Sequence, residues 1–217
     1  MSILLQIVGW LLPWYLRRQV LIRLLGYEIS PSARIGFSIV VADKVAIDSD
    51  SRIGHATLIK NLSEFRLGKN AIIGNFNIIS GCHGTQLYPY SEQNCVFVME
   101  DGAAITHEHR VDCANKVTIG AFTTIAGRGS QIWTHGIDPR ESKQLTAEVR
   151  VGRYVLVSTR VTILKGSILE DNSIVAAGAV VNGVVKSLTL VAGMPARSIR
   201  NLTGTEKYFL RTTPVVD

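Results

Sequence analysis

Aliphatic residues recur every six positions along most of this chain. One block begins with Ile29, Ile35, Val41, Ile47, Ile53 and Ile59, and another reads Val151, Val157, Ile163, Leu169, Val175 and Val181. Between these blocks the frame slips by two residues near Phe65 and again between Val117 and Ile119. An α-helix repeats about every 3.6 residues and a strand about every 2, so neither has this period as one long element. Short strands separated by turns do have it, if three strands close one triangular coil and stacked coils bury the aliphatic column.

The composition fits a β-structure in a single domain. The chain has 217 residues, of which 47% are apolar and only 7% are aromatic, and 19 residues are glycine. Branched aliphatic side chains suit strands, and glycine suits the tight turns that each coil needs. The residues therefore predict an all-β fold.

Charge and cysteine content limit the classes of partner. The net charge of +6 favours anionic partners. No long run of lysine or arginine occurs, so we expect no nucleic acid among them. The three cysteines, Cys82, Cys95 and Cys113, lack metal-ligand spacing, and their odd number favours a reducing cytoplasm over a disulfide framework.

Residues 1–27 form a separate N-terminal segment. It is apolar as far as Trp14 and then becomes basic and amphipathic, and Pro13 is expected to break a helix there. Its uncharged part is shorter than the roughly 20 residues that span a bilayer, and it lacks the pattern of a secretory signal. We expect an amphipathic helix that either caps the core or lies on an anionic membrane surface.

Two stretches leave the repeat, at about residues 80–98 and 133–150. Long excursions from a solenoid form loops, which often carry function. The second excursion follows the sequence QIW and places His135 beside a glycine, an acid and a proline, in THGIDP. This break in the repeat makes it the first candidate for a functional site.

Several stretches resemble a known family. They are VTIGAFTTIAG followed by SQIWTHGIDP, then VRVGRYVLVSTRVTILKGSILEDNSIVAAGAVV, and VAGMPARSIR. With the hexapeptides over residues 28–200, they resemble the hexapeptide-repeat acyltransferases, in the branch of galactoside, maltose and bacterial polysaccharide O-acetyltransferases. The resemblance implies a left-handed parallel β-helix, here with an N-terminal helix, two loop insertions and a C-terminal tail at residues 201–217. It also implies an acyl-CoA donor, usually acetyl-CoA, and a homotrimer with active sites between adjacent β-helices.

His135 lies where the resembled family has its catalytic histidine. Imidazole titrates near neutrality, which suits a general base that takes the proton of an acceptor hydroxyl. The family often reads T-x-H-P-x-D where this chain reads THGIDP, so Pro139 comes later and the loop departs from the pattern. The alternative is a loop histidine that pairs with Asp138.

The predicted acceptor side comprises Asp112, His107, His109 and Trp133. Asp112, in HRVDCANKVTIG, resembles the aspartate of the family's substrate pocket, and a turn-capping role is the alternative. His107 and His109 alternate, so in a strand both would face the same side. Together with His135 they raise a rival zinc site, as in the carbonic-anhydrase relatives of the fold. Those relatives carry two histidines five apart in one stretch, which this chain lacks.

The third block resembles the CoA groove of the family. The matching positions are Ser158 and Thr159 near the thioester, Ala177 and Gly178 along the pantetheine arm, and Arg197 and Arg200 near the nucleotide. A hydroxyl or backbone N–H at the first pair would stabilise the oxyanion. Gly183 stands where the family often has lysine, so Lys186 is the expected substitute. Ordinary repeat packing is the alternative for Ala177 and Gly178.

These observations predict a cytoplasmic, acetyl-CoA-dependent O-acetyltransferase that acts on a sugar hydroxyl of a capsule, exopolysaccharide or O-antigen unit. Such units are often assembled on membrane lipid carriers, which suggests a peripheral contact with the inner face of the membrane. No metal is expected, because a thioester is already activated. A zinc-dependent, carbonic-anhydrase-like β-helix enzyme and a non-catalytic β-helix scaffold are the two rival classes.

Overall fold

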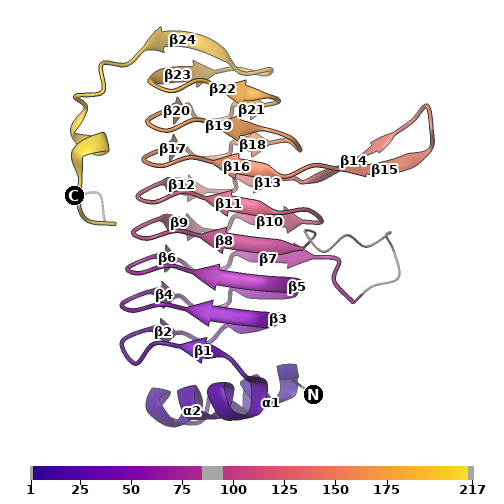
Figure 1. Cartoon of the computed structure of the whole chain (residues 1–217), viewed down its shortest axis with the longest axis vertical. Coiled ribbons are helices and arrows are strands. Elements are labelled where there is room, and N and C mark those ends of the chain that lie inside the picture. The colour runs from indigo at the N-terminus through magenta and orange to yellow at the C-terminus, as the bar shows by residue number, and fades with distance from the viewer. Residues whose placement is uncertain (1, 85–94, 215–217) are drawn as a thin grey trace.

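The computed structural model describes residues 2–84 and 95–214. Figure 1 shows a column of stacked strands with two helices at its N-terminal end, a hairpin that projects from its side, and a C-terminal segment that runs back along the opposite side. The predicted insertion at about residues 80–98 lies partly outside the described residues.

The column is a parallel β-helix with three faces. Equivalent strands of successive coils pair in register, as Ile53 does with Ile73 and Ile73 with Ile105. Two long strands, β3 (Ile39–Ile47) and β5 (Leu58–Leu67), continue from one face into the next. Because the start of β5 pairs with β7 and its end with β8, the first two faces form one continuous sheet.

The remaining strands are grouped by the face to which they belong. The first face continues through β7 (Ile78–Gly81), β10 (Arg110–Cys113), β13 (Gln131–Ile132), β18 (Thr162–Ile163) and β21 (Val180–Val181). The second face comprises β1 (Glu28–Ile29), the ends of β3 and β5, β8 (Val96–Met99), β11 (Val117–Ile119), β16 (Val149–Val151), β19 (Ile168–Leu169) and β22 (Val184–Val185). The third face comprises β2 (Arg34–Ile35), β4 (Arg52–Ile53), β6 (Ile72–Ile73), β9 (Ala104–His107), β12 (Thr124–Arg128), β17 (Leu156–Val157), β20 (Ile174–Val175), β23 (Thr189–Ala192) and the antiparallel β24 (Arg197–Asn201).

The second face explains the two-residue slips in the hexapeptide frame. In five successive coils this face turns two buried side chains inward, namely Val45 and Ile47, Phe65 and Leu67, Phe97 and Met99, Val117 and Ile119, and Val149 and Val151. Phe65 and Phe97 stack with their ring centroids 5.7 Å apart. A wider face needs extra residues in its coil, whereas the narrower coils after Val151 keep the strict count of six.

The predicted frame is wrong at Val41. The pairing of β3 with β5 shifts register between Val40 and Ala42. Val40 is consequently 1% exposed and belongs to the core, whereas Val41 is only half-buried. The column therefore absorbs an irregularity of one residue where β3 turns from the first face to the second.

A buried polar ladder follows the corner between the third and first faces. Each rung accepts the backbone N–H of the residue one coil above, at distances of 2.9–3.2 Å, and the rungs are Ser38, Thr57, Asn77, His109 and Ser130. All five side chains are at most 3% exposed. Because a buried N–H without a partner is costly, the ladder stabilises the turns of this corner.

Two helices close the N-terminal end of the core. They are α1 (Ser2–Gly9) and α2 (Trp14–Leu25), with Pro13 between them as predicted. The Arg17 guanidinium is 4% exposed and donates to the carbonyl oxygens of Ile35, Gly36 and Ser38 at 2.9–3.2 Å. Burial lowers the pKa of Arg17 to about 10, so it stays cationic at neutral pH. These contacts place the segment as a cap on the first coil.

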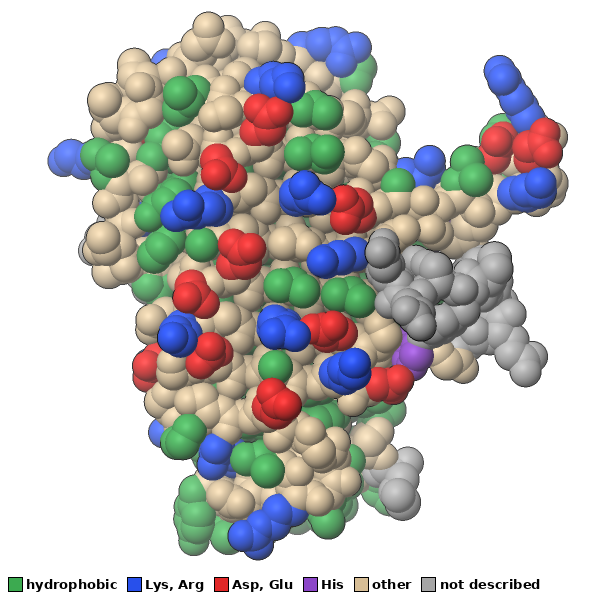
Figure 2. Space-filling model, in the orientation of Figure 1, with side chains coloured by type: hydrophobic (Ala, Val, Ile, Leu, Met, Phe, Trp, Pro, Cys, Tyr) green, Lys and Arg blue, Asp and Glu red, His purple; other side chains and the backbone are tan. Residues whose placement is uncertain are grey.

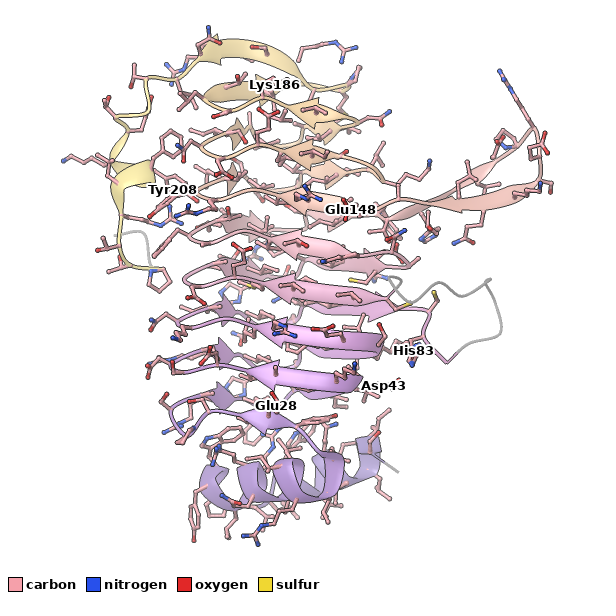
Figure 3. The ribbon with its side chains drawn as sticks, viewed as in Figure 1. Glu28, Asp43, His83, Glu148, Lys186 and Tyr208 are labelled. Carbon is pink, nitrogen blue, oxygen red and sulfur yellow. The ribbon has the colours of Figure 1, made fainter. Side chains whose placement is uncertain are left out.

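Further contacts fasten the cap and the C-terminal segment to the column. Gln6 bonds both the N–H and the carbonyl of Val40, at 2.9 and 2.7 Å. At the other end of the chain, the short 3-10 helix η1 (Lys207–Leu210) brings Tyr208 against the third face, where its hydroxyl donates to the Val155 carbonyl at 2.9 Å (Figure 3). Among the described helices, none is both long and apolar enough to cross a bilayer.

Arg17→Met tests the cap. Removal of the guanidinium leaves three carbonyl oxygens of the first coil without their charged donor, and we expect a loss of about 2–3 kcal/mol in the free energy of unfolding. Urea denaturation followed by circular dichroism measures it. Arg23→Met on the exposed side of the same helix is the matched control and should leave the midpoint within experimental error. Equal stability of the two variants would contradict the capping role.

Candidate active site

The second insertion is an antiparallel hairpin, β14 (His135–Asp138) with β15 (Lys143–Thr146). It leaves the column at the corner between the first and second faces and projects outward (Figure 1). His135 pairs with Thr146 at the base of the hairpin, where it joins the column. The histidine therefore lies at the junction of the hairpin and the column.

His135 and Asp112 form a pair across neighbouring coils. The Nδ1 atom of His135 lies 2.8 Å from Oδ2 of Asp112. The side chain of His135 is 31% exposed and that of Asp112 is 15% exposed. A carboxylate at Nδ1 fixes the tautomer in which Nε2 carries the lone pair. Within residues 2–84 and 95–214 no group bonds Nε2, so this atom is available to a substrate.

Thr134 holds the carboxylate in place. Its backbone N–H and its hydroxyl both donate to Oδ2 of Asp112, at 3.0 and 2.7 Å. Thr134 is fully buried, and its Oγ1 also accepts the N–H of Asn115 at 2.9 Å. Thr134 is not among the residues predicted from the sequence, although it directly precedes His135. Asp112 therefore both caps the turn at Thr134 and contacts His135. Asp138, the alternative partner of the histidine, accepts the N–H of Arg140 instead.

Trp133 forms one wall beside the histidine. The two rings meet edge to face, with centroids 5.9 Å apart and planes at 83°. The indole N–H donates to the Gln131 side chain at 2.9 Å, which fixes the ring. Across the base of the hairpin, a Cβ added at Gly136 would approach the Lys165 side chain to 3.2 Å. Successive residues of a strand point to opposite faces, so Lys165 lies against the face of β14 opposite to the His135 side chain, and Trp133 is the wall beside the histidine.

His107 and His109 lie at a different corner from His135. Glu108 between them has a φ of +60°, so the two side chains do not face the same side as a strand would require. His107 is exposed, and its Nδ1 accepts the N–H of Asn75 at 2.9 Å. His109 is a rung of the buried ladder, with Nδ1 bonded to Ser130 and Nε2 to Thr106. The expectation of two cleft-facing histidines is wrong for His109.

The zinc alternative is not favoured by this arrangement. Both ring nitrogens of His109 are engaged inside the protein, and His135 stands at the far end of the first face. In the described ranges, no group of three His, Cys, Asp or Glu side chains is placed to hold a metal ion.

Four of the predicted CoA-binding residues lie at the corner between the third and first faces. Ser158 and Thr159 follow β17, and Ala177 and Gly178 follow β20 one coil later. Ala177 is exposed, and nothing lies within 4 Å of a Cβ built at Gly178, so this corner has a low, open surface. A face about five residues wide spans roughly 16 Å, so one chain does not bring these residues to His135.

The predicted basic residues lie at the C-terminal end of the column. Lys186 lies between the second and third faces and pairs with Glu170 at 3.0 Å (Figure 3). Arg197 and Arg200 are exposed on β24. A hollow of about 450 Å³ at this end is lined by Gly183, Lys186 and Arg197 among others.

A further groove on the described surface lies elsewhere. It measures about 830 Å³, is lined by the ends of β3, β5 and β8, and contains none of the predicted site residues. The second face around it carries interspersed acidic and basic side chains (Figure 2). Neither this groove nor the hollow of about 450 Å³ is lined by His135 or Asp112.

Comparison of the sequence with family models finds no match. Two curated relatives are similar, both from Escherichia coli K12. A putative lipopolysaccharide biosynthesis O-acetyl transferase is 28% identical over 121 residues, which covers 48% of this chain and 60% of the relative. A galactoside O-acetyltransferase is 24% identical over 105 residues, which covers 48% of this chain and 51% of the relative. The chain thus matches little more than half the length of these relatives.

Two solved structures with a similar fold are acyltransferases. A hexapeptide-repeat acetyltransferase of Vibrio cholerae O1 biovar eltor, solved with acetyl-CoA, superposes with a TM-score of 0.52 at 24% identity, over 64% of this chain and 71% of that one. An N-acyltransferase of Bacillus cereus, solved with a dTDP-amino sugar and CoA, superposes with a TM-score of 0.54 at 15% identity, over 82% and 89%. The fold is therefore the left-handed β-helix of the hexapeptide-repeat acetyltransferases. The resemblance seen in the sequence is confirmed by the two curated relatives, a putative lipopolysaccharide biosynthesis O-acetyl transferase and a galactoside O-acetyltransferase.

His109→Asn tests the assignment of His109 to the ladder. Burial, followed by the nearby His107, lowers the pKa of His109 to about 4. The unfolded chain therefore binds a proton near pH 6.5 that the folded chain refuses, and stability falls as the pH drops from about 6.5 to about 4. Asn77 fills the same place one coil below, so asparagine should fit and should remove this part of the acid sensitivity. Thermal melts of both proteins between pH 4 and 7 measure it, and an unchanged slope would refute the assignment.

Proposed function

We propose that this protein is an acetyl-CoA-dependent O-acetyltransferase that acts on a sugar hydroxyl. The observation that carries the proposal is the His135–Asp112 pair, with Nε2 directed away from the carboxylate at the base of the hairpin. The supporting comparisons are the two O-acetyltransferase relatives and the acetyl-CoA complex of a protein with this fold. A capsule, exopolysaccharide or O-antigen unit is the proposed acceptor, as the name of the first relative suggests.

The reaction needs one proton to move twice. Nε2 of His135 takes the proton of the acceptor hydroxyl as its oxygen attacks the thioester carbonyl. The tetrahedral intermediate then expels the CoA thiolate, which receives that proton, and leaves the acetyl ester on the sugar. Asp112 stabilises the imidazolium that exists between these steps and holds the ring in one orientation. Trp133 offers an apolar surface for a sugar ring beside the reacting hydroxyl.

The donor side of the site must come from elsewhere, and we propose a homotrimer. Ser158, Thr159, Ala177 and Gly178 share the corner across the first face from His135, so in one chain they cannot act on the same substrate. A second copy whose donor corner faces the first copy's His135 completes the site. Arg197 and Arg200 then remain available for the nucleotide phosphates, to which guanidinium groups bind well.

The proposed location is the cytoplasm, at the inner face of the membrane. The three cysteines are thiols in the structure. Burial raises the pKa of Cys82 to about 12 and raises the pKa of Cys113 well above its ordinary value, which suits inert structural thiols in a reducing compartment.

His135→Ala and Asp112→Asn test the chemistry. We expect the first to abolish transfer and the second to lower kcat by at least about 100-fold, because an amide bears no charge to stabilise the imidazolium. Thioester consumption on a panel of sugars gives kcat, and calorimetric titration of acetyl-CoA gives binding. Binding should persist in both variants. Asp138→Asn in the same hairpin is the matched control and should keep its activity. If wild-type protein does not bind acetyl-CoA, the proposal fails.

Mixed assemblies test whether the site lies between copies. His135→Ala removes the base, and Ala177→Trp blocks the exposed donor corner without touching the core. Each variant alone should be inactive. After equal amounts are unfolded and refolded together, about a quarter of the sites should combine an intact base with an intact donor corner. Recovery of about a quarter of wild-type activity supports the shared site, and no recovery contradicts it.

A further inference from the structure

The outer surface of the N-terminal cap is apolar. Val8, Leu11 and Tyr15 are 56%, 88% and 67% exposed. They are accompanied by the other exposed apolar side chains of this segment, Ile3, Leu4, Ile7, Leu12, Leu16 and Leu24. We call these nine residues the cap surface. The terminal cap of a solenoid needs a polar outer face to stay soluble, so closure of the core does not explain this composition.

The polarity of helix α1 is reversed relative to an ordinary surface helix. Its Gln6 side chain is 2% exposed and bonds the first coil, as does Arg17 of α2, which is 4% exposed. Helix α1 carries no charged side chain. Surface helices of globular proteins bury the apolar stripe and expose the polar one. Here the polar groups close the column, and the apolar groups remain for a second contact.

The surroundings of the cap surface are aromatic and basic. Trp10 meets Phe37 edge to face at 5.9 Å, and Phe37 is itself 54% exposed. The first 41 residues contain four arginines against a single acid, Glu28. Of these arginines, Arg23 and Arg34 are exposed. Figure 2 shows hydrophobic and basic side chains together at this end of the molecule.

We propose that the cap surface docks onto an anionic membrane leaflet. Its aliphatic side chains would enter the boundary between headgroups and acyl chains, and Trp10 and Tyr15 would lie at headgroup level, where amphipathic aromatic rings are favoured. Arg23 and Arg34 would contact lipid phosphates. The charge argues for lipid over end-to-end pairing with a second copy, because two such basic ends would repel each other.

The proposal sets the height of the candidate site above the membrane. The first face passes through β3, β5, β7, β10 and β13, so His135 stands four strand spacings above the first coil, or roughly 20 Å. In a homotrimer with parallel axes all three caps face the same way, so three weak contacts act together. A sugar carried on a membrane lipid would then meet the site without leaving the surface. This last consequence rests on the proposed function, whereas the docking itself does not.

Co-sedimentation with vesicles tests the proposal. Full-length protein is mixed with vesicles of phosphatidylcholine alone or of phosphatidylcholine with phosphatidylglycerol. We expect binding to the anionic vesicles and weakening of at least about tenfold by the double substitution Val8→Glu and Leu11→Glu. Arg23→Glu should weaken binding to the vesicles that contain phosphatidylglycerol and should leave any binding to phosphatidylcholine vesicles unchanged. Val184→Glu with Leu210→Glu places the same charges on exposed apolar positions far from the cap and should bind like wild type.

A second measurement needs no variant. Trp10 and Trp14, two of the three tryptophans, lie at the cap, so vesicles with brominated acyl chains should quench a large part of the wild-type fluorescence. Absence of both sedimentation and quenching overturns the proposal. Unchanged binding of a folded Val8→Glu, Leu11→Glu variant overturns it too. So does a wild-type assembly in solution with twice the number of copies found in this variant, because the cap surface would then join two copies end to end. Transfer to soluble sugars, measured in the same variant, reports on the proposed enzyme activity separately.

Discussion

The backbone hydrogen bonds between successive coils are the constraint on which this molecule depends. In a parallel β-helix each coil satisfies its neighbours, so the unpaired groups are concentrated at the two ends. At the N-terminal end the guanidinium of Arg17 and the amide of Gln6 bond the carbonyls of the first coil. At the C-terminal end β24 turns back and pairs antiparallel with β23. Both ends are closed by parts of the chain that do not follow the repeat.

The fold could be predicted where packing alone decides the residue. The six positions from Val151 to Val181 are all at most 2% exposed, because a narrow coil admits one aliphatic side chain per face. The two-residue slips of the hexapeptide frame near Phe65 and Ile119 identified residues that are buried, but the sequence did not show why the frame slips there. A second inward side chain on one face is a property of coil width, which is set by the coils above and below. For the same reason the register shift at Val40 could not be read from the sequence.

The candidate site could be predicted only in part, because the two residues of its main contact, His135 and Asp112, are far apart in the sequence. The break in the repeat pointed to His135, but Asp112 is 23 residues earlier and meets it because the two strands stack. The pairing of Arg110 with Gln131 and Val111 with Ile132 places Asp112 beside the start of the hairpin. The prediction that His109 lines the cleft is wrong because its side chain is a buried hydrogen-bond acceptor, a role that has no sequence signature. A serine, a threonine and an asparagine perform the same task in other coils.

The column orients the His135 side chain, whereas the hairpin extends from this residue into solvent. Strand β14 begins at this residue, so the imidazole is held by Asp112 and by the buried Thr134 of the column, while the strand beyond it extends into solvent. Ile137 is 77% exposed and Leu145 is 44% exposed, so little apolar burial supports the hairpin within its own chain. An isolated two-stranded hairpin is only marginally stable in water. Orientation of the proposed base is therefore derived from the stacked coils, which leaves the hairpin able to fit against a neighbouring copy without disturbing the histidine.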